Sequence, residues 1–598
     1  MVRSYVGFST SLHDPAVAIV DGDGQVVYAE ATERYLQNKR GWHSAPDGFL
    51  RLPALIRRHC PPNSELVLAN NWSESYARDR FEPIFQRSAR LAHAIQQPSS
   101  RDQTRFPQER DLLLGEYTVM SRMTYRFMRD KELFGSNLML HTLPAHKLHG
   151  YTIVGYRSFD HHLTHAAMAS FLSPFAEAAV AILDGVGEGR AVMLYTYADG
   201  RLTPLHDDDA SDQLGASQAS LGGFYSQLCA ACGFDWLGGE EWKVMGLAPY
   251  GKRNDAWYDL LRGMFEIEKC RLTNGARRGD AIAAMREASI RAVGRHPLES
   301  ADLAFTGQHV FEEVAAALLS NLAETTGSKH LVFAGGCALN SVFNGKITEL
   351  TPFARAYVPS APGDDGTAVG AALLAYCEDT GRRYPHTQQA FTTPYLGDRL
   401  SAEVIENLQH LGRKQSTLPA GKTVSQYTAE CLAAGKLVGW AQGRAEFGPR
   451  ALGNRSILAD PRSPSVKETI NARVKFREEF RPFAPAILHE HGPAYFEHYQ
   501  ETPYMERALR FKPEAAAKVP GVVHEDGTGR LQTVKRAWNE RYYDLIEHFY
   551  RITGVPVILN TSFNIMGKPI IHSVEDAIAV FYTTGLDVLV LDDVVLEK

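Results

Sequence analysis

Short apolar runs separated by acidic glycine turns open the chain. SYVGFST (4–10) and AVAIV (16–20) are followed by the turn DGDG (21–24) and then by QVVYAEA (25–31). An Asp-Gly pair between two apolar runs is a strong β-hairpin signal. A similar unit returns at 179–205, where AVAILDG, a glycine-rich turn and AVMLYTYADGRLTPL follow one another. We therefore predict strands and hairpins at both places, and an internal duplication.

Strand-to-helix patterns follow the second hairpin unit. FEEVAAALLSNLAETTG (311–327) has the pattern of a helix. HLVFAGG (330–336) then runs into the helical pattern CALNSVFNGKI, and ARAYVPSAPGDDG (354–366) runs into TAVGAALLAYCE. This alternation of strands and helices predicts a mixed α/β fold.

The length of 598 residues predicts at least two domains, because single cores stop growing near roughly 250–300 residues. The polar stretch 378–395 has the composition of a connection, so we place the domains at 1–394 and 395–598. The second domain is predicted to contain three strands and one helix, at 436–443, 482–488, 554–564 and 465–476.

Composition limits the classes of partner. Hydrophobic residues make up 44% of the chain and charged residues 22%, as in an ordinary soluble enzyme, and the formal net charge is −6. We expect no nucleic acid as a partner, because nucleic-acid binding usually needs a basic surface. The N-terminal residues contain no apolar run of membrane-spanning length, and the seven cysteines are scattered. We therefore expect no membrane attachment and a reducing, cytoplasmic location.

Two histidines one helical turn apart are the first candidates for chemistry. His161 and His165 are spaced i, i+4 in DHHLTH, and Asp160 can cap a helix that begins there. Imidazoles at this spacing can hold one metal ion. The alternative is a hydrogen-bonded histidine pair at a helix start.

Two aspartates at strand ends extend this candidate metal site. Asp184 ends the apolar run AVAIL, and Asp364 follows another predicted strand. Strand ends are where α/β folds place ligand groups. Two histidines with two carboxylates form a mixed nitrogen and oxygen set that suits iron, with zinc and manganese left open. The alternative is turn chemistry, since Asp-Gly favours turns.

Glycines and cations form candidate anion sites. Gly335 and Gly336 lie between a strand and a helix, where backbone N–H groups can meet phosphate, although a plain tight turn explains them equally well. Two segments concentrate cations: GRAEFGPRALGNRSILADPR and VKFREEFRPFAP hold Arg444, Arg450, Arg455, Arg462, Lys475, Arg477 and Arg481. Arginine forks match phosphate oxygens, so this cluster in an acidic chain predicts a buried anion site. The alternative is a set of structural salt bridges with Glu446, Glu478 and Glu479.

NTSFN (560–564) follows the apolar run GVPVIL. Its short hydroxyl and amide side chains can hold a nucleotide phosphate or ribose, or form a satisfied turn.

Together these motifs resemble the O-carbamoyltransferases of antibiotic and nodulation-factor biosynthesis over nearly the whole chain. The motifs occur in the family's order: HDPAVAIVDGDG, HHLTHAA, LDGVGEG, EEWKVMGLAPYG, GGCALNSVFNGKI, GRAEFGPRALGNRSILADPR, FREEFRPFAP, HEDGTGRLQTV and GVPVILNTSFNIMGKPI. Any one of them can arise by chance, whereas the ordered set is specific.

The resemblance implies a fold and an activity. The N-terminal part is similar to the duplicated actin/Hsp70-type fold of the tRNA threonylcarbamoyl transferase, and the C-terminal part is similar to threonylcarbamoyl-AMP synthase. In such enzymes carbamoyl phosphate and ATP, with Mg²⁺, give carbamoyl-adenylate in the C-terminal domain. The N-terminal domain, which holds iron as Fe²⁺ or Fe³⁺, then passes the carbamoyl group to a hydroxyl of a small-molecule acceptor.

The resemblance also implies residue roles. The metal ligands match His161, His165, Asp184 and Asp364, with Asp365 as an alternative. The nucleotide loop matches Gly335, Gly336 and Asn340, and the lysine–arginine pair and Ser-x-Asn motif match Lys475, Arg477, Ser562 and Asn564. The remaining predicted phosphate contacts are Arg444, Arg450, Arg455, Arg481 and Arg530, of which Arg450 is also a catalytic candidate.

His13 and Lys39 match the family's HD motif and its early basic position, so both are expected near the transferred group. The family's usual EERF is TERY at Thr32–Tyr35, and its usual lysine-histidine is Lys39-Arg40.

Two readings from other classes stay open: a tRNA-threonylcarbamoylating enzyme and a non-enzymatic nucleotide-binding scaffold. The sequence does not identify the acceptor or distinguish O- from N-carbamoylation, and a homodimer is one option for the assembly. Residues 71–150 are rich in aromatic side chains and arginines, which fits an acceptor pocket or an added helical layer.

Overall fold

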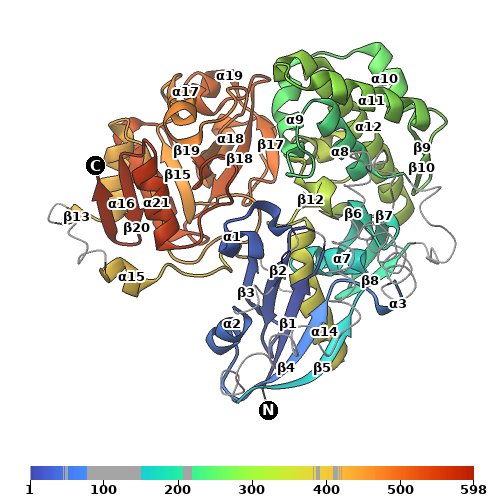
Figure 1. Ribbon diagram of the computed structural model, residues 1–598, viewed down its shortest axis with the longest axis horizontal. Coiled ribbons are helices and arrows are strands. Elements are labelled where there is room, and N and C mark those ends of the chain that lie inside the picture. Colours follow the sequence, from blue (N-terminus) through green and yellow to red (C-terminus); the bar gives the residue numbers. More distant parts are fainter. Residues whose placement is uncertain are drawn as a thin grey trace, which may run out of the picture. The chain divides into compact units, whose positions relative to one another are not determined.

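The computed structural model describes residues 2–11, 13–42, 44, 46, 51–76, 150–205, 219–381, 383–384, 391–407, 415–416, 418 and 421–598 (Figure 1). The chain divides into two compact units: unit 1 is Met1–Met168 with Asp364–Pro385, and unit 2 is Ala169–Gly363 with His386–Lys598. A pocket or helical layer was predicted at 71–150, and residues 77–149 of this region lie outside the part of the chain that the structure describes.

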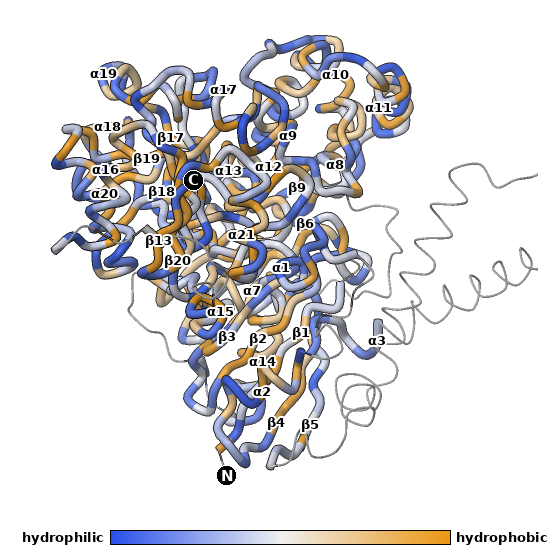
Figure 2. The backbone as a smooth tube through the Cα atoms, turned by 60° about the vertical axis from the view of Figure 1, so that its left-hand side comes forward, coloured by the Kyte–Doolittle hydropathy of each residue, from blue (hydrophilic) through white to orange (hydrophobic). Residues whose placement is uncertain are grey.

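A five-stranded sheet in the order β3-β2-β1-β4-β5 forms the centre of unit 1. Its strands are β1 (Arg3–Ser9), β2 (Ala16–Val20), β3 (Val26–Ala31), β4 (Glu65–Asn70) and β5 (Thr152–Ser158). The first three strands pair antiparallel, and β4 and β5 continue the sheet parallel to β1. Figure 2 shows β1 and β4 as hydrophobic stretches, as expected for strands covered by helices.

Helices complete unit 1. They are α1 (Thr32–Leu36), α2 (Leu52–His59), α3 (Glu74–Tyr76), α7 (His161–Phe171, which runs on into unit 2) and α14 (Thr367–Thr380). The backbone of α14 approaches β1 so closely that a Cβ on Gly7 would overlap the carbonyl oxygen of Ala368. A Cβ on Gly370 would likewise overlap the carbonyl oxygen of Thr164 on α7. Two glycines therefore fix α14 between the sheet and α7.

The first sheet of unit 2 repeats this topology. Its order is β12-β11-β6-β7-β8, with strands β6 (Glu177–Gly187), β7 (Arg190–Ala198), β8 (Arg201–Pro204), β11 (His330–Ala334) and β12 (Arg355–Tyr357). Again three strands form an antiparallel meander, and two more continue parallel to the first strand of the meander. The internal duplication predicted from the two hairpin units is confirmed at the level of strand order and direction.

Helices and a small hairpin accompany this sheet. They are α8 (Leu221–Ala231), α9 (Glu241–Leu247), α10 (Asp255–Arg262), β9 (Phe265–Glu268), β10 (Arg271–Asn274), α11 (Arg278–Ala292), α12 (Ala301–Thr326) and α13 (Ser341–Leu350). Helix α12 begins ten residues before the pattern that predicted it at 311–327, because buried residues at helical spacing, among them Leu303, Thr306 and Val310, already precede Phe311.

A mixed nine-stranded sheet forms the C-terminal part of unit 2, in the order β13-β21-β20-β14-β15-β19-β16-β18-β17. Its strands are β13 (Gln415–Ser416), β14 (Val438–Ala441), β15 (Arg455–Ala459), β16 (Ala484–Leu488), β17 (Arg507–Arg510), β18 (Thr528–Val534), β19 (Val557–Ser562), β20 (Val588–Leu591) and β21 (Val594–Glu597). Its helices are α15 (Ala402–Asn407), α16 (Val424–Ala433), α17 (Val466–Ile470), α18 (Gly492–Tyr495), α19 (Pro513–Ala516), α20 (Glu540–Thr553) and α21 (Val574–Thr583).

The three strands predicted in this part are confirmed as β14, β16 and β19. The helix predicted at 465–476 is α17, continued by a π-helical turn at Asn471–Lys475. The mixed α/β class is therefore confirmed, whereas the two named component folds and the boundary between 394 and 395 stay predictions. Among the helices that the structure describes, no candidate for a membrane span is found.

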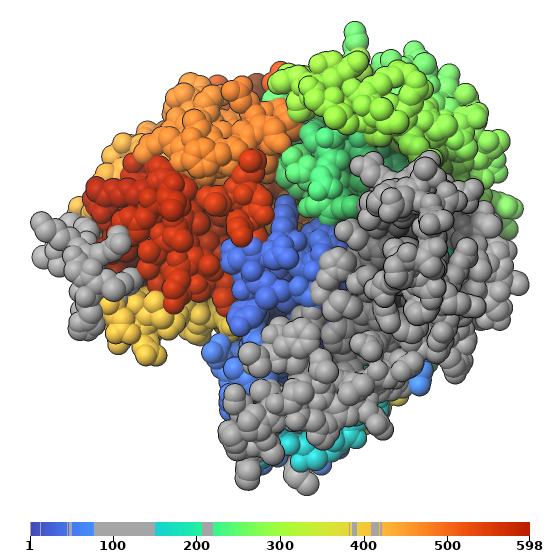
Figure 3. All heavy atoms as spheres, in the orientation of Figure 1, coloured from blue at the N-terminus to red at the C-terminus, as the bar shows by residue number. Residues whose placement is uncertain are grey.

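Segments far apart in the sequence lie side by side in unit 2: the Cβ position of Gly246 on α9 is 3.5 Å from Pro482, and green and orange surfaces meet in Figure 3. The Asn344 side-chain amide on α13 donates to the carbonyls of Ala338 and Glu506, at 2.8 and 2.9 Å. A Cβ on Gly345 would overlap the carbonyl oxygen of Ala508 on β17. Helix α13 thus packs backbone to backbone against the C-terminal sheet.

We predict that Gly345→Ala destabilises the protein by about 1–3 kcal/mol, because the added methyl group must push α13 away from β17. Gly279→Ala on α11 is the matched control, since a Cβ there meets nothing within 4 Å and alanine is the better helix former. Thermal melts of both variants are the measurement. Equal melting temperatures for Gly345→Ala and the unaltered protein would contradict the close packing.

Candidate functional site

Helix α7 begins where the sequence places it. Asp160 Oδ1 accepts a hydrogen bond from the Leu163 N–H at 2.9 Å, and the Asp160 carbonyl accepts from the Thr164 N–H at 3.0 Å. This N-terminal capping starts the helix at His161. His161 and His165 are therefore one turn apart on one face of α7, and both side chains are buried.

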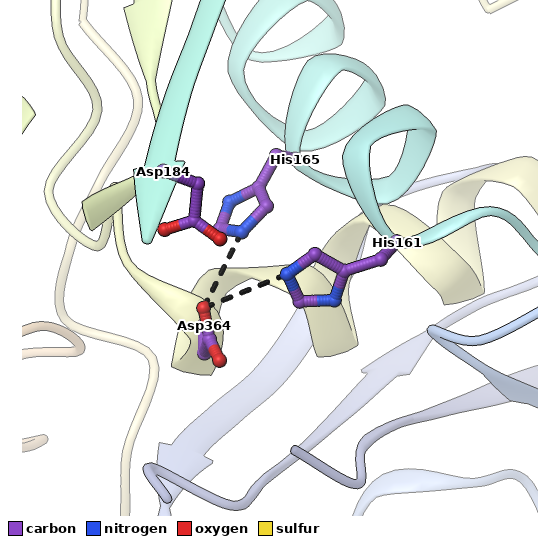
Figure 4. Close-up of side chains that lie close together, drawn as sticks. All are labelled: His161, His165, Asp184 and Asp364. Carbon is purple, nitrogen blue, oxygen red and sulfur yellow. Dashed lines mark ion pairs between the residues drawn. The ribbon is translucent and has the colours of Figure 1, made fainter. Parts of the chain in front are cut away.

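Asp364 lies opposite this histidine pair, in the short turn Asp364–Gly366 before α14. Its Oδ1 atom lies 3.7 Å from His161 Nε2 and 3.5 Å from His165 Nε2. Figure 4 shows both imidazole rings turned toward this carboxylate. The close crossing of α14 and α7 at Gly370 brings the turn to the histidines.

These three side chains fit a metal ion. Ligand atoms at ~2.1 Å from one tetrahedral ion lie about 3.4 Å apart, close to the separations between Asp364 and the two rings. Neither ring nitrogen of buried His165 makes a hydrogen bond within the described residues, and an unsatisfied buried imidazole is costly unless a ligand completes it. Two imidazoles and a carboxylate suit iron, zinc or manganese.

The end of strand β4 supports His161. Asn71 Nδ2 lies 3.4 Å from His161 Nδ1, and the Trp72 ring stacks on the imidazole with 4.7 Å between centroids. Sequence reasoning placed both residues in the 71–150 region, as part of an acceptor pocket or a helical layer, and did not predict their contact with His161. Their position directly after a strand was the available signal, because such ends carry ligand-supporting groups in α/β folds.

Asp365, unlike Asp364, is not grouped with His161 and His165 as a candidate ligand. Its Oδ1 accepts a hydrogen bond from the Gly366 N–H at 3.0 Å. Burial, with the negative charges of Asp14 and Glu33, raises the pKa of Asp365 to about 8. Of the two adjacent aspartates, Asp364 is thus the one placed to join the histidine pair.

His13 lies beside Asp364. Its Nδ1 atom lies 2.8 Å from Asp14 Oδ2 and 3.9 Å from Asp364 Oδ2, and 32% of its side chain is exposed. Burial acts to raise the pKa of Asp14, but Arg40 and His13 outweigh it and lower that pKa below its ordinary range. An ionised Asp14 therefore orients His13.

Lys39 lies in a short 3₁₀ turn at Lys39–Gly41, half-buried. Its positive charge acts to lower the pKa of Glu33, but burial outweighs this effect and the pKa is raised. Its expected proximity to the transferred group stays a prediction.

The predicted nucleotide loop lies in unit 2, at the turn between β11 and α13. Gly335 has φ +89°, and a Cβ there would overlap the carbonyl oxygen of Leu183, so glycine is required. The Gly336 N–H donates to Asp184 Oδ1 at 2.9 Å. Asn340 caps α13 by accepting from the Phe343 N–H at 3.1 Å. Asp184 belongs to unit 2, so its place among the metal ligands stays a prediction.

The structure brings Lys475 together with the Ser-x-Asn motif. Lys475 Nζ lies 2.6 Å from Asn564 Oδ1 and 3.4 Å from Ser562 Oγ, and Ser562 Oγ lies 2.8 Å from Asn564 Oδ1. Burial, with the charges of Arg477 and Arg481, lowers the pKa of Lys475 well below its usual value.

Four half-buried arginines, which we call the arginine cluster, act on one another electrostatically: Arg450, Arg477, Arg481 and Arg530. Burial lowers the pKa of Arg450 to about 10, and burial with the charge of Arg481 lowers that of Arg477 to about 9. Burial and the other three arginines lower the pKa of Arg530 well below its ordinary value. A bound anion would relieve this repulsion, which favours an anion site over structural salt bridges.

The other arginines of the same motif are used inside the fold. Arg455 is fully buried and donates to the carbonyls of Gln442, Asn454, Asp398 and Gly443. Arg444 Nε donates to the Gly397 carbonyl at 2.9 Å, and Arg462 pairs with Asp460 at 2.6 Å. The side chains of these three arginines have structural contacts, but with carbonyl groups and Asp460, and the glutamates named in the alternative are not among these contacts. A salt bridge of the kind that the alternative named joins Arg481 to Glu478 at 3.1 Å, and the case for an anion site rests on the arginine cluster as a whole.

Comparison with known proteins places this chain in a family. Residues 124–373 match the family model for the carbamoyltransferase N-terminus, and residues 429–598 match that for the carbamoyltransferase C-terminus. Nodulation protein NolO of Bradyrhizobium diazoefficiens is 36% identical over 452 residues, which cover 73% of this chain and 79% of that protein. Nodulation protein U of Sinorhizobium fredii is 28% identical over 579 residues, 93% of each chain. The chain belongs to the carbamoyltransferase family, and is thus an enzyme that transfers carbamoyl groups.

Solved structures show only distant likeness. HypF of T. kodakarensis aligns with a TM-score of 0.28 at 13% identity, over 65% of this chain and 50% of that one. Component A of the Acidaminococcus fermentans (R)-2-hydroxyglutaryl-CoA dehydratase aligns with a TM-score of 0.29 at 13% identity, over 63% and 99%. Scores this low do not establish a shared fold.

We predict that the double variant His161→Ala/His165→Ala loses the metal ion expected at this site, iron by the resemblance, together with carbamoyl transfer, but keeps adenylate formation, because that step is expected in the C-terminal part. Metal analysis of the purified protein is the measurement. His162→Ala is the matched control. His162 is one residue along α7 from His161, so its side chain points in another direction and is not grouped with the candidate ligands. This variant should leave the iron content unchanged. Full retention of iron by the double variant would disprove the ligand assignment.

Proposed function

We propose that this chain is an ATP-dependent O-carbamoyltransferase, which forms carbamoyl-adenylate from carbamoyl phosphate and ATP and passes the carbamoyl group to a hydroxyl of a small molecule. The observation that carries the proposal is the arginine cluster in a chain of the carbamoyltransferase family. Mutually repelling guanidinium groups, next to the Lys475–Ser562–Asn564 contact, suit a substrate with several phosphate oxygens.

The activation step can be written with its atoms balanced. Water splits carbamoyl phosphate into carbamate and phosphate. A carbamate oxygen then attacks the α-phosphorus of ATP, the bond to the β-phosphate breaks, and pyrophosphate leaves. Donors fixed in a partly water-excluded site stabilise the negative charge that develops in such steps, and Mg²⁺ accompanies the nucleotide.

Contacts within unit 2 support passage of the adenylate toward the glycine loop. Arg450 Nη2 donates to the Leu339 carbonyl at 3.4 Å, in the turn between Gly336 and Asn340. The arginine cluster and the predicted nucleotide loop are therefore neighbours. A short enclosed route between them would protect the adenylate from water.

In the transfer step the acceptor hydroxyl attacks the carbamoyl carbon, and AMP leaves with the electron pair of the broken bond. We assign the acceptor's proton to His13. Since ionised Asp14 accepts from His13 Nδ1–H, the Nε2 atom keeps its lone pair and can take that proton. An iron ion held by His161, His165 and Asp364, with Asp184 as the further predicted ligand, would supply Lewis-acid polarisation of the carbamoyl oxygen or a site for the AMP phosphate.

The acceptor is proposed only as a hydroxylated small molecule. A screen of hydroxylated natural products with carbamoyl phosphate and ATP, read by the mass gain of one HNCO unit, tests this class. The tRNA-modifying alternative is disfavoured by the net charge of −6, and a salt-dependent tRNA-binding assay separates the two.

We predict that Arg450→Ala keeps the fold and lowers turnover by two to three decades, since loss of one charged donor to a developing anion costs about 3–4 kcal/mol. Arg450→Lys should restore turnover only in part, because lysine lacks the forked contact. Pyrophosphate release from ATP and carbamoyl phosphate is the measurement, with a melting curve beside it.

Arg551→Ala is the matched control, because Arg551 is exposed on α20, where it pairs with Glu547 at 2.9 Å. Normal turnover of an Arg450→Ala protein that melts early would show that Arg450 has a structural role instead.

A further inference from the structure

A chain of ion pairs runs from α9 to the loop that carries Arg477 and Arg481. The Nζ atom of buried Lys243 lies 2.7 Å from Glu240 Oε1 and 2.7 Å from Glu478 Oε1. Glu478 Oε2 accepts a hydrogen bond of 3.1 Å from Arg481 Nη1. Charges therefore alternate along this chain, and its last member belongs to the arginine cluster.

Arg481 is held in place without full pairing to Glu478. Its guanidinium carbon lies 3.9 Å from the centre of the Trp242 ring, a stacked cation–π contact. The loop also packs on α9, since Pro482 lies 3.5 Å from the Cβ position of Gly246. Because Lys243 takes one oxygen of Glu478, this carboxylate does not form the two-oxygen fork that arginine and carboxylate favour.

The charge of Glu478 bears directly on the arginine cluster. Burial acts to raise the pKa of Glu478, but Lys243, a backbone N–H and Arg481 outweigh it and lower the pKa to about 2. The carboxylate is therefore ionised at neutral pH, and its charge acts on Arg477 as well as on Arg481. A carboxylate that closed on these arginines would take the donors that a phosphate needs.

We propose that Lys243 is a positioning residue, which holds Glu478 by one oxygen and so keeps Arg477 and Arg481 available to the phosphate of the substrate. This inference rests on the proposed function, since it takes the arginine cluster to bind carbamoyl phosphate. Without the Lys243 charge, Glu478 turns to the arginines and competes with phosphate for the same donors. The effect falls on the KM for carbamoyl phosphate more than on kcat, because the competition is relieved once substrate saturates the site.

The test is steady-state pyrophosphate release by the full chain at saturating ATP, for Lys243→Gln, Glu478→Gln and the double variant. Lys243→Gln should raise the KM for carbamoyl phosphate about tenfold, the loss expected when one charge-assisted hydrogen bond is taken from a phosphate. Glu478→Gln should have a KM for carbamoyl phosphate equal to that of the unaltered protein or lower. The double variant should return to within about threefold of the unaltered protein, because the competing carboxylate is gone.

The double variant separates positioning from a merely structural role. If Lys243 only holds α9 in place, removing Glu478 as well repairs nothing, and a double variant as weak as Lys243→Gln overturns the proposal. A normal KM for Lys243→Gln overturns it too. If Lys243→Gln fails to fold, Glu478→Gln still tests the proposal, because Glu478 is partly exposed and its replacement should be tolerated. An increased KM in Glu478→Gln would contradict competition between Glu478 and phosphate.

Arg450→Ala, measured alongside, distinguishes this inference from the proposed function. Normal KM and kcat in Arg450→Ala would mean that the cluster does not bind carbamoyl phosphate, and the proposed function itself would fail. Loss of turnover in Arg450→Ala, with unaltered kinetics in both Lys243 variants, would remove the role of Lys243 alone.

Discussion

Mutual repulsion among half-buried arginines is the constraint on which the chemistry of unit 2 depends. The positive charges of Arg450, Arg477 and Arg481 all act on Arg530, and burial disfavours the charged form of each. Such an arrangement lowers stability unless an anion offsets it. Residues kept at a cost to stability are typical of binding sites, where the missing partner is the ligand. A carboxylate close enough to stabilise the cluster would also occupy it, and the shared position of Glu478 between Lys243 and Arg481 avoids that outcome.

The cluster is assembled from separate segments, so the loops that carry it need bracing of their own. Arg450 follows β14, Arg477 and Arg481 follow the π-helical turn after α17, and Arg530 lies on β18. Arg455, the first residue of β15, donates to four carbonyl groups, and in the loop before it Glu446 accepts the Leu452 N–H at 2.6 Å. The arginines of this motif therefore have different roles: buried Arg455 holds the loop, and half-buried Arg450 belongs to the arginine cluster.

The sequence was sufficient for features that depend on local periodicity. The hairpins, the strand-to-helix turns and the one-turn spacing of His161 and His165 all follow from patterns a few residues long. It named Asp364 as the ligand but left Asp365 open as an alternative, because adjacent residues in a turn differ only in the direction of their side chains. Nor could it distinguish Arg455 from Arg450, or pair Lys243 with Glu478 across 235 positions, since such choices are made when segments pack together.

The predicted nucleotide loop at Gly335–Asn340 contacts two other parts of unit 2, Asp184 and helix α13. Its Gly336 N–H already donates to Asp184 Oδ1, so this group orients a carboxylate that the sequence predicts as a metal ligand. The left-handed backbone at Gly335 is what turns the chain closely enough past Leu183 to make that contact. After the turn, Asn340 caps α13, and α13 packs against β17. The loop therefore contacts Asp184 on one side and, through α13, the C-terminal sheet on the other, so that a single turn positions both a predicted metal ligand and a helix that packs on that sheet.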